Sequence, residues 1–65
     1  MKHLSQREVS LNQTLDKNGN VVRKGNIVHF DNKHYCIENI KYFNSTIFIE
    51  SDNDIVLAKY CEKVA

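Results

Sequence analysis

The chain has no proline and no tryptophan, and only two glycines and two cysteines stand among its 65 residues. No apolar run approaches the roughly 18 residues that a membrane-spanning helix needs. Residues 1–6 lack the apolar region of a secretory signal peptide, so we expect a cytoplasmic protein. Small disulfide scaffolds are far richer in cysteine, and we therefore expect Cys36 and Cys61 to be reduced thiols.

A surplus of one charge sign is missing as well. Nine Lys and Arg residues nearly balance eight Asp and Glu residues, for a net charge of +1, whereas a dedicated nucleic-acid domain carries a basic surplus. A chain this short supports one core worth roughly 3–5 kcal/mol. We expect a single domain over residues 1–65, with an N-terminal segment 1–20 and a core 21–65. So small a scaffold has little room for an active-site cleft, which favours a binding module without cofactors over an enzyme.

What the chain does contain is typical of a small β-protein. Twenty residues are Val, Ile, Thr, Tyr or Phe, which pack well on a pleated sheet. Turn signals rich in Asn, Asp, Ser and Gly recur between short apolar runs; they lie at residues 17–20, 24–26, 31–33, 44–45 and 51–54.

The clearest predicted hairpin joins residues 27–30 to residues 34–40. A loop of two or four residues places alternate side chains on opposite sides of this hairpin. The predicted core side carries Val28, Phe30, Tyr35 and Ile37. The opposite side carries Ile27, His29, His34, Cys36 and Glu38.

Two further strands are predicted over residues 46–50 and 54–58. Their expected inward residues are Ile47, Ile49, Ile55 and Leu57, which leaves Phe48 and Val56 pointing outward. A strand that is apolar on both sides is either covered on both or presents a contact surface. Residues 59–63 then have the length of a single helical or 3₁₀ turn before Val64 returns to the sheet.

The first 20 residues allow two interpretations. Ser5 and Glu8 fit a capping box, which favours a helix from about Gln6. The apolar residues of 9–15 instead follow a period of two, and Asn18-Gly19 is a strong hairpin signal leading into residues 21–22. The segment is therefore a strand or a short helix.

Residues 23–30 (Arg-Lys-Gly-Asn-Ile-Val-His-Phe) and 35–38 (Tyr-Cys-Ile-Glu) resemble the opening strands of small SH3-like β-barrels. Residues 57–64 look like the short 3₁₀ turn and closing strand of those barrels. The resemblance implies an all-β, SH3-like barrel of five or six short antiparallel strands, with a 3₁₀ turn before the last strand and a role in binding. A closed barrel also removes exposed sheet edges. The chain lacks the repeated glycines of KOW-type barrels and the tryptophan and prolines of the eukaryotic SH3 groove, so neither RNA nor proline-rich peptides are implied.

Aromatic side chains are the main candidates for a contact surface. Tyr42 and Phe43 stand at the start of an expected loop, and Tyr60 lies in the C-terminal turn. Exposed aromatics on a rigid scaffold are typical of protein-binding hot spots. One of Tyr42 and Phe43 is alternatively a core residue that closes the end of the barrel. With the outward Phe48, the predicted partner-binding residues are Tyr42, Phe43, Tyr60 and Phe48.

Two other kinds of binding site are alternatives, and each would use a different set of residues. A nucleic-acid-binding module would use Lys41, Arg23, Lys24 and Lys33, and it requires these cations to converge in space. A zinc site would use His29, His34, Cys36 and Cys61, with His3 as another possible ligand, although only the His29 and His34 spacing is typical of structural zinc. These side chains are otherwise a solvated polar face and a small apolar thiol.

We therefore expect a non-enzymatic protein-binding module that acts as a small adaptor or inhibitor. Eight asparagines and six isoleucines are typical of an AT-biased coding sequence, which suits a bacterial or phage protein acting on a host factor. The expected partner is a protein, with nucleic acid as the alternative, and the expected state is a monomer or weak homodimer.

Overall fold

The computed structural model describes residues 7–65. In this part the chain forms nine strands and one 3₁₀ turn, and none of its helices is long and apolar enough to cross a membrane. The strands are β1 (Val9–Ser10), β2 (Gln13–Leu15), β3 (Val21–Arg23), β4 (Ile27–Phe30), β5 (Lys33–Cys36), β6 (Asn39–Phe43), β7 (Thr46–Ser51), β8 (Asp54–Leu57) and β9 (Glu62–Lys63). The 3₁₀ turn η1 (Ala58–Tyr60) precedes the last strand. The predicted all-β class and the position of the 3₁₀ turn are confirmed.

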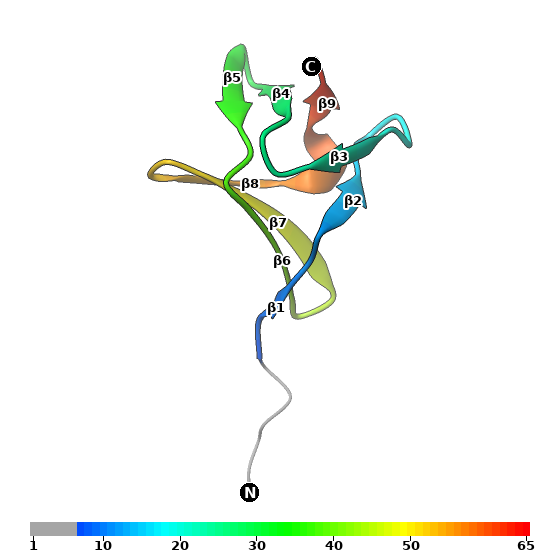
Figure 1. Ribbon diagram of the computed structural model, residues 1–65, viewed down its shortest axis with the longest axis vertical. Coiled ribbons are helices and arrows are strands. Elements are labelled where there is room, and N and C mark those ends of the chain that lie inside the picture. The colour runs from blue at the N-terminus through cyan, green and yellow to red at the C-terminus, as the bar shows by residue number, and fades with distance from the viewer. Residues whose placement is uncertain (1–6) are drawn as a thin grey trace, which may run out of the picture.

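The strands form three antiparallel sheets around one core (Figure 1). The largest sheet has the order β1-β6-β7-β8, a second contains β2 and β3, and a third has the order β5-β4-β9. Strand β9 pairs with β4 and so brings the C-terminal end of the chain back to its middle. The arrangement is barrel-like, and more strands appear than the five or six expected because several are only two or three residues long.

The core forms where the sheets face one another. Its buried apolar residues are Val22, Val28, Tyr35, Ile37, Ile40, Ile49, Val56, Ala58 and Cys61, with Leu11, Phe30 and Ile47 packed against them. The predicted inner side of the first hairpin is confirmed, because Val28 pairs with Tyr35 and both are buried. Strict alternation along the strands accounts for this outcome.

Three hairpins close through loops of only two residues. The pairs that flank these loops are Phe30 with Lys33, Phe43 with Thr46 and Ser51 with Asp54. The loop residues Asp31, Asn32, Asn44, Ser45 and Asp52 all have positive φ. Tight hairpin turns require such backbone, and Asn and Asp tolerate it better than most residues. Asparagine and aspartate thus take the place that glycine holds in many hairpins.

The prediction for the inward residues of β8 is wrong. Ile55 and Leu57 were expected to point inward and Val56 outward. In the structure Val56 is buried opposite Ile49, whereas 64% of Ile55 is exposed. The two-residue loop sets Ser51 opposite Asp54 and thereby fixes which residues of β8 share a side with Ile49.

Within residues 9–15, Val9–Ser10 form β1 and Gln13–Leu15 form β2, which confirms the strand interpretation for this segment. Ser5 and Gln6, which belong to the helix interpretation, lie outside the described residues. The hairpin predicted at Asn18-Gly19 is confirmed by the pairing of β2 with β3. Gly19 has a φ of 81°, in the left-handed region that favours glycine.

Asp16 holds the β2–β3 hairpin against the C-terminal strand. Its carboxylate accepts hydrogen bonds from the backbone N–H groups of Asn18 at 2.9 Å, Asn20 at 2.8 Å and Lys63 at 2.7 Å. Burial favours the neutral acid, but the backbone donors outweigh it and lower the pKa of Asp16 below its ordinary value. The carboxylate of Asp16 therefore links its own hairpin to Lys63, which lies 47 positions further along the chain.

Candidate functional site

The structure separates the four predicted partner-binding aromatics into three places. Tyr42 and Phe43 both belong to β6 and not to the loop that was expected, because the loop consists of Asn44 and Ser45 alone. Successive residues of a strand point to opposite sides. Tyr42 therefore shares the core side of the sheet with its cross-strand partner Ile47, whereas Phe43 points to the other side.

Tyr60 lies apart from these residues, on η1. Its ring stacks on Phe30 with the centroids 6.4 Å apart, and the ammonium group of Lys59 lies 5.3 Å from its centroid. Tyr60 is half exposed. It does not line the groove that contains Phe48.

Phe43 and Phe48 lie on the side of the four-stranded sheet that is turned away from the core. There they line a shallow groove of about 180 Å³ together with Ile55, Glu8, Lys41 and Glu50. We call these six residues the outer groove. The cross-strand pairs explain its composition, since Lys41 lies opposite Phe48 and Glu50 lies opposite Ile55. Sequence reasoning identified Phe43 and Phe48 but missed Ile55, which it assigned to the core.

The charges of the outer groove are partly satisfied within it. The Nζ atom of Lys41 lies 3.4 Å from a carboxylate oxygen of Glu8 and 3.5 Å from one of Glu50. The hydrogen bond to Glu8 and the negative charges of Glu50 and Glu8 raise the pKa of Lys41 above its ordinary value. Because two carboxylates surround one ammonium group, this part of the groove carries a net negative charge.

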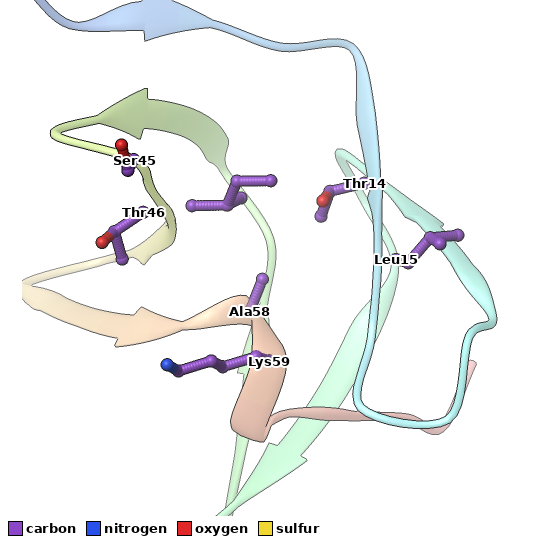
Figure 2. A pocket seen from close by; sticks show the side chains of 7 residues that line it. Thr14, Leu15, Ser45, Thr46, Ala58 and Lys59 are labelled. Carbon is purple, nitrogen blue, oxygen red and sulfur yellow. The ribbon is translucent and has the colours of Figure 1, made fainter.

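A second hollow of about 330 Å³ lies between β2, the β6–β7 turn and η1. Its lining consists of Thr14, Leu15, Ser45, Thr46, Ile47, Ala58 and Lys59. Figure 2 shows Thr14 and Ala58 pointing into this space, while Lys59 extends toward the side on which Ser45 and Thr46 lie. The lining combines the hydroxyl groups of Thr14, Ser45 and Thr46 with aliphatic side chains, and it contains no aromatic residue that would anchor a partner.

The four cations predicted to contact nucleic acid come from different elements. Lys41 is engaged by two carboxylates of the outer groove. Arg23 is held on β3, where its Nε donates a hydrogen bond of 3.0 Å to the side-chain oxygen of Gln13. Lys24 lies in the β3–β4 turn, and Lys33 begins β5 at the far end of the neighbouring hairpin.

The predicted zinc ligands are divided between the surface and the core. His29 and His34 are cross-strand partners with ring centroids 5.1 Å apart, and Cys36 is exposed on the same hairpin. Cys61 is buried in the core, where its thiol donates to the carbonyl oxygen of Leu57 at 3.3 Å. His3 lies outside the described residues. Within residues 7–65, no three His, Cys, Asp or Glu side chains gather closely enough to hold a metal ion.

The environments of the two cysteines differ accordingly. Burial, and next the negative charge of Asp16, raise the pKa of the Cys61 thiol above its ordinary value. A buried thiol with a raised pKa is a poor nucleophile, so Cys61 serves packing.

Comparisons with known proteins give no relative. No family model matches the chain, and neither a curated protein nor a solved structure is significantly similar to it.

Proposed function

We propose that the protein is a non-enzymatic protein-binding module and that the outer groove is its contact surface. One observation carries the proposal: Phe43, Phe48 and Ile55 form an apolar groove on a sheet face that points away from the core. A domain of this size gains more stability by burying such side chains than by exposing them. Their position outside the core therefore favours a role in contact.

The composition of the groove supports this function. Protein interfaces typically place aromatic and aliphatic anchors at the centre and charged groups at the rim. Phe48 is half-buried and held between β6 and β8, so it has little freedom to lose on binding. Lys41, Glu8 and Glu50 supply charges beside it.

Nucleic-acid binding is the less favoured alternative. Phosphate contacts need cations that are free to approach the backbone, yet Lys41 already lies against two carboxylates. The two functions differ in their response to salt. Phosphate-dominated binding weakens steeply between about 50 and 200 mM salt, whereas a contact anchored by Phe48 changes little.

Finer features of the proposal follow from the sequence. The β6–β7–β8 succession, the 3₁₀ turn and the returning strand β9 support the SH3-like resemblance. We place the protein in the cytoplasm, with Cys36 and Cys61 as free thiols. An adaptor or inhibitor of bacterial or phage origin, acting as a monomer or weak homodimer, fits a small domain that engages a partner through the outer groove.

The test compares two exposed aliphatic residues on different sheets. Ile55 on β8 belongs to the outer groove, and Leu15 on β2 does not. Proteins captured from a lysate of the native host by the wild type, by Ile55→Lys and by Leu15→Lys are quantified by mass spectrometry. We expect at least one partner to be lost by about tenfold with Ile55→Lys and kept with Leu15→Lys.

Circular dichroism of each variant verifies that the fold is intact. Phe48→Ala should lose the same partner as Ile55→Lys. If both groove variants keep every partner of the wild type, or if Leu15→Lys loses the same partners equally, the outer groove is not the contact surface.

A further inference from the structure

Strand β8 forms one edge of the four-stranded sheet (Figure 1). The opposite edge, β1, has only two residues, whereas β8 has four. Edge strands in natural proteins are usually short, or they carry lysine, proline or a bulge that prevents pairing with another chain. Edge strand β5 has such protection in Lys33 and His34. Strand β8 reads Asp54, Ile55, Val56 and Leu57, and so its apolar part is unprotected.

The register of the β7–β8 hairpin determines which main-chain groups face the free edge. In a two-residue hairpin the pair that flanks the loop, here Ser51 and Asp54, is hydrogen-bonded, and such pairs alternate along the ladder. The main-chain N–H and C=O groups of Ile55 and Leu57 are therefore directed away from β7. The carbonyl oxygen of Leu57 accepts the thiol of Cys61. Within residues 7–65, Ile55 thus presents an open donor and an open acceptor.

The same residue presents the most exposed large apolar side chain of the described part of the chain, at 64% exposure. This side chain borders the outer groove, next to Glu50 and on the same side as Phe48. A strand placed beside β8 would therefore meet main-chain partners and an apolar surface at one position. Peptide recognition by strand addition uses this combination, in which the main chain gives affinity and side-chain contacts give specificity.

The charge around this edge indicates the chemistry of the occupant. Glu50 lies opposite Ile55, Asp54 begins β8, and Asp52 lies in the adjoining turn. The one cation of the groove, Lys41, is already bound by Glu8 and Glu50. An acidic edge favours a basic partner. A second copy would bring the same acidic residues together across a two-fold axis, which disfavours self-association.

We propose that β8 accepts an extended basic segment of the partner protein as a fifth strand of the sheet. Alternate apolar side chains of this segment lie beside Ile55 on the side of the outer groove. Its Lys or Arg side chains lie on the other side of the sheet, near Asp54 and the turn that carries Asp52. The segment pairs through the main chain of Ile55. This inference rests on the proposed function and adds to it the binding mode and the chemical class of the partner.

The test uses a fluorescein-labelled synthetic peptide of ten residues that alternates valine and lysine, measured by fluorescence anisotropy. A matched peptide replaces every lysine by glutamate. We expect the valine–lysine peptide to bind the wild type about tenfold more tightly than the valine–glutamate peptide. Ile55→Lys, which adds a charge that blocks an edge strand, should weaken the valine–lysine peptide about tenfold, and Leu15→Lys should leave it unchanged.

Main-chain pairing is tested separately with two N-methylated forms of the valine–lysine peptide. Because only every second N–H of an added strand points toward β8, methylation of one set of alternate residues should abolish binding and methylation of the other set should not. Equal binding of both forms overturns strand addition while leaving the outer groove as a contact surface. Failure of the valine–lysine peptide to bind, or equal affinity for the glutamate peptide, also overturns the inference.

Sedimentation equilibrium tests whether a second copy of the chain occupies the β8 edge instead. We expect the wild type to be a monomer at the concentrations of the binding assay. A dimer that Ile55→Lys dissociates would show that a second copy occupies the edge, and it would overturn the inference. The proposed function fails by a different observation, namely that Ile55→Lys and Phe48→Ala keep every host partner.

Discussion

The β4–β5 and β7–β8 hairpins have the same construction and different surfaces. Each closes through a two-residue loop. In β4–β5 the inner side carries Val28 and Tyr35, and the other side carries His29, His34 and Cys36. Apart from Ile27, which pairs with Cys36, the second side has no large apolar residue, as expected for a hairpin that covers a core on one side and faces water on the other.

The β7–β8 hairpin is apolar on both sides. Ile49 and Val56 enter the core, and Phe48 and Ile55 lie on the opposite side. The core requires only one of these two sides. The comparison teaches that the proposed contact surface lies where the alternation of apolar and polar residues breaks down, with Phe48 and Ile55 outside the core.

The strongest test of this comparison substitutes one residue on each side of the β7–β8 hairpin. We expect Ile49→Ala to lower the free energy of unfolding by about 2–5 kcal/mol, because it leaves a cavity in the core. Ile55→Ala should change the free energy by less than about 0.5 kcal/mol, since Ile55 is mostly exposed. Urea denaturation followed by circular dichroism measures both.

Ile49→Ala removes about as much free energy as so small a domain possesses, so Ile49→Val, with an expected cost of about 1 kcal/mol, serves as a variant that stays folded. A greater loss for Ile55→Ala than for Ile49→Val would restore the original prediction that Ile55 points inward.

Much of this architecture is readable from the sequence, and the failures have identifiable causes. The period of two in residues 27–37 identifies Val28, Tyr35 and Ile37 as buried, because polar residues alternate with them. In β8 three apolar residues follow one another, so the pattern contains no information about which of them points inward. In β8 the length of the preceding loop determines which residues point inward. The turn signal at residues 51–54 did not distinguish a loop with an even number of residues from one with an odd number.

The candidate site was predicted less completely for the same kind of reason. Phe43 was predicted as a loop aromatic, with a place in the core as the alternative, and Phe48 as an outward residue of its strand. Ile55 was recognised as part of the groove only once the register was known. Asp16 was missed although Asp16 and Asn18 precede a glycine, as in many turns that an Asp side chain closes. Its bond to Lys63 spans 47 positions, and no local pattern contains it.

Asp16 makes a polar contact between the β2–β3 hairpin and the sheet that contains β4. Asp16 bonds to Lys63 of β9, and β9 pairs with β4. We expect Asp16→Asn to lower the free energy of unfolding by about 1–3 kcal/mol, because a charged acceptor of several backbone N–H groups is replaced by a neutral one. Asp52→Asn, in the exposed β7–β8 turn, is the matched control and should have little effect.

The pH dependence of the free energy of unfolding provides a second test of the role of Asp16. The folded-state pKa of Asp16 lies below its ordinary value of 3.8, so the unfolded chain binds this proton more readily than the folded chain does. The contribution of Asp16 is therefore fully present well above pH 3.8 and is lost as the pH falls through its folded-state pKa. Urea denaturation at pH 3 and pH 6 should show a smaller acid loss for Asp16→Asn than for the wild type. An identical acid loss would contradict the role of Asp16.

The smallest expected effect concerns the polar side of the β4–β5 hairpin, where Cys36 is exposed, in contrast to Cys61 in the core. A disulfide reagent should modify one thiol rapidly in the folded protein and the second only in urea, because Cys61 is buried and its pKa is raised. Cys36→Ser should abolish the rapid reaction and change the free energy of unfolding by less than about 0.5 kcal/mol. Two rapid thiols, or a rapid thiol that survives in Cys36→Ser, would mean that the core does not close over Cys61. A bulky label on Cys36 that leaves partner binding intact would separate the solvated side of β4–β5 from the outer groove of the β7–β8 hairpin.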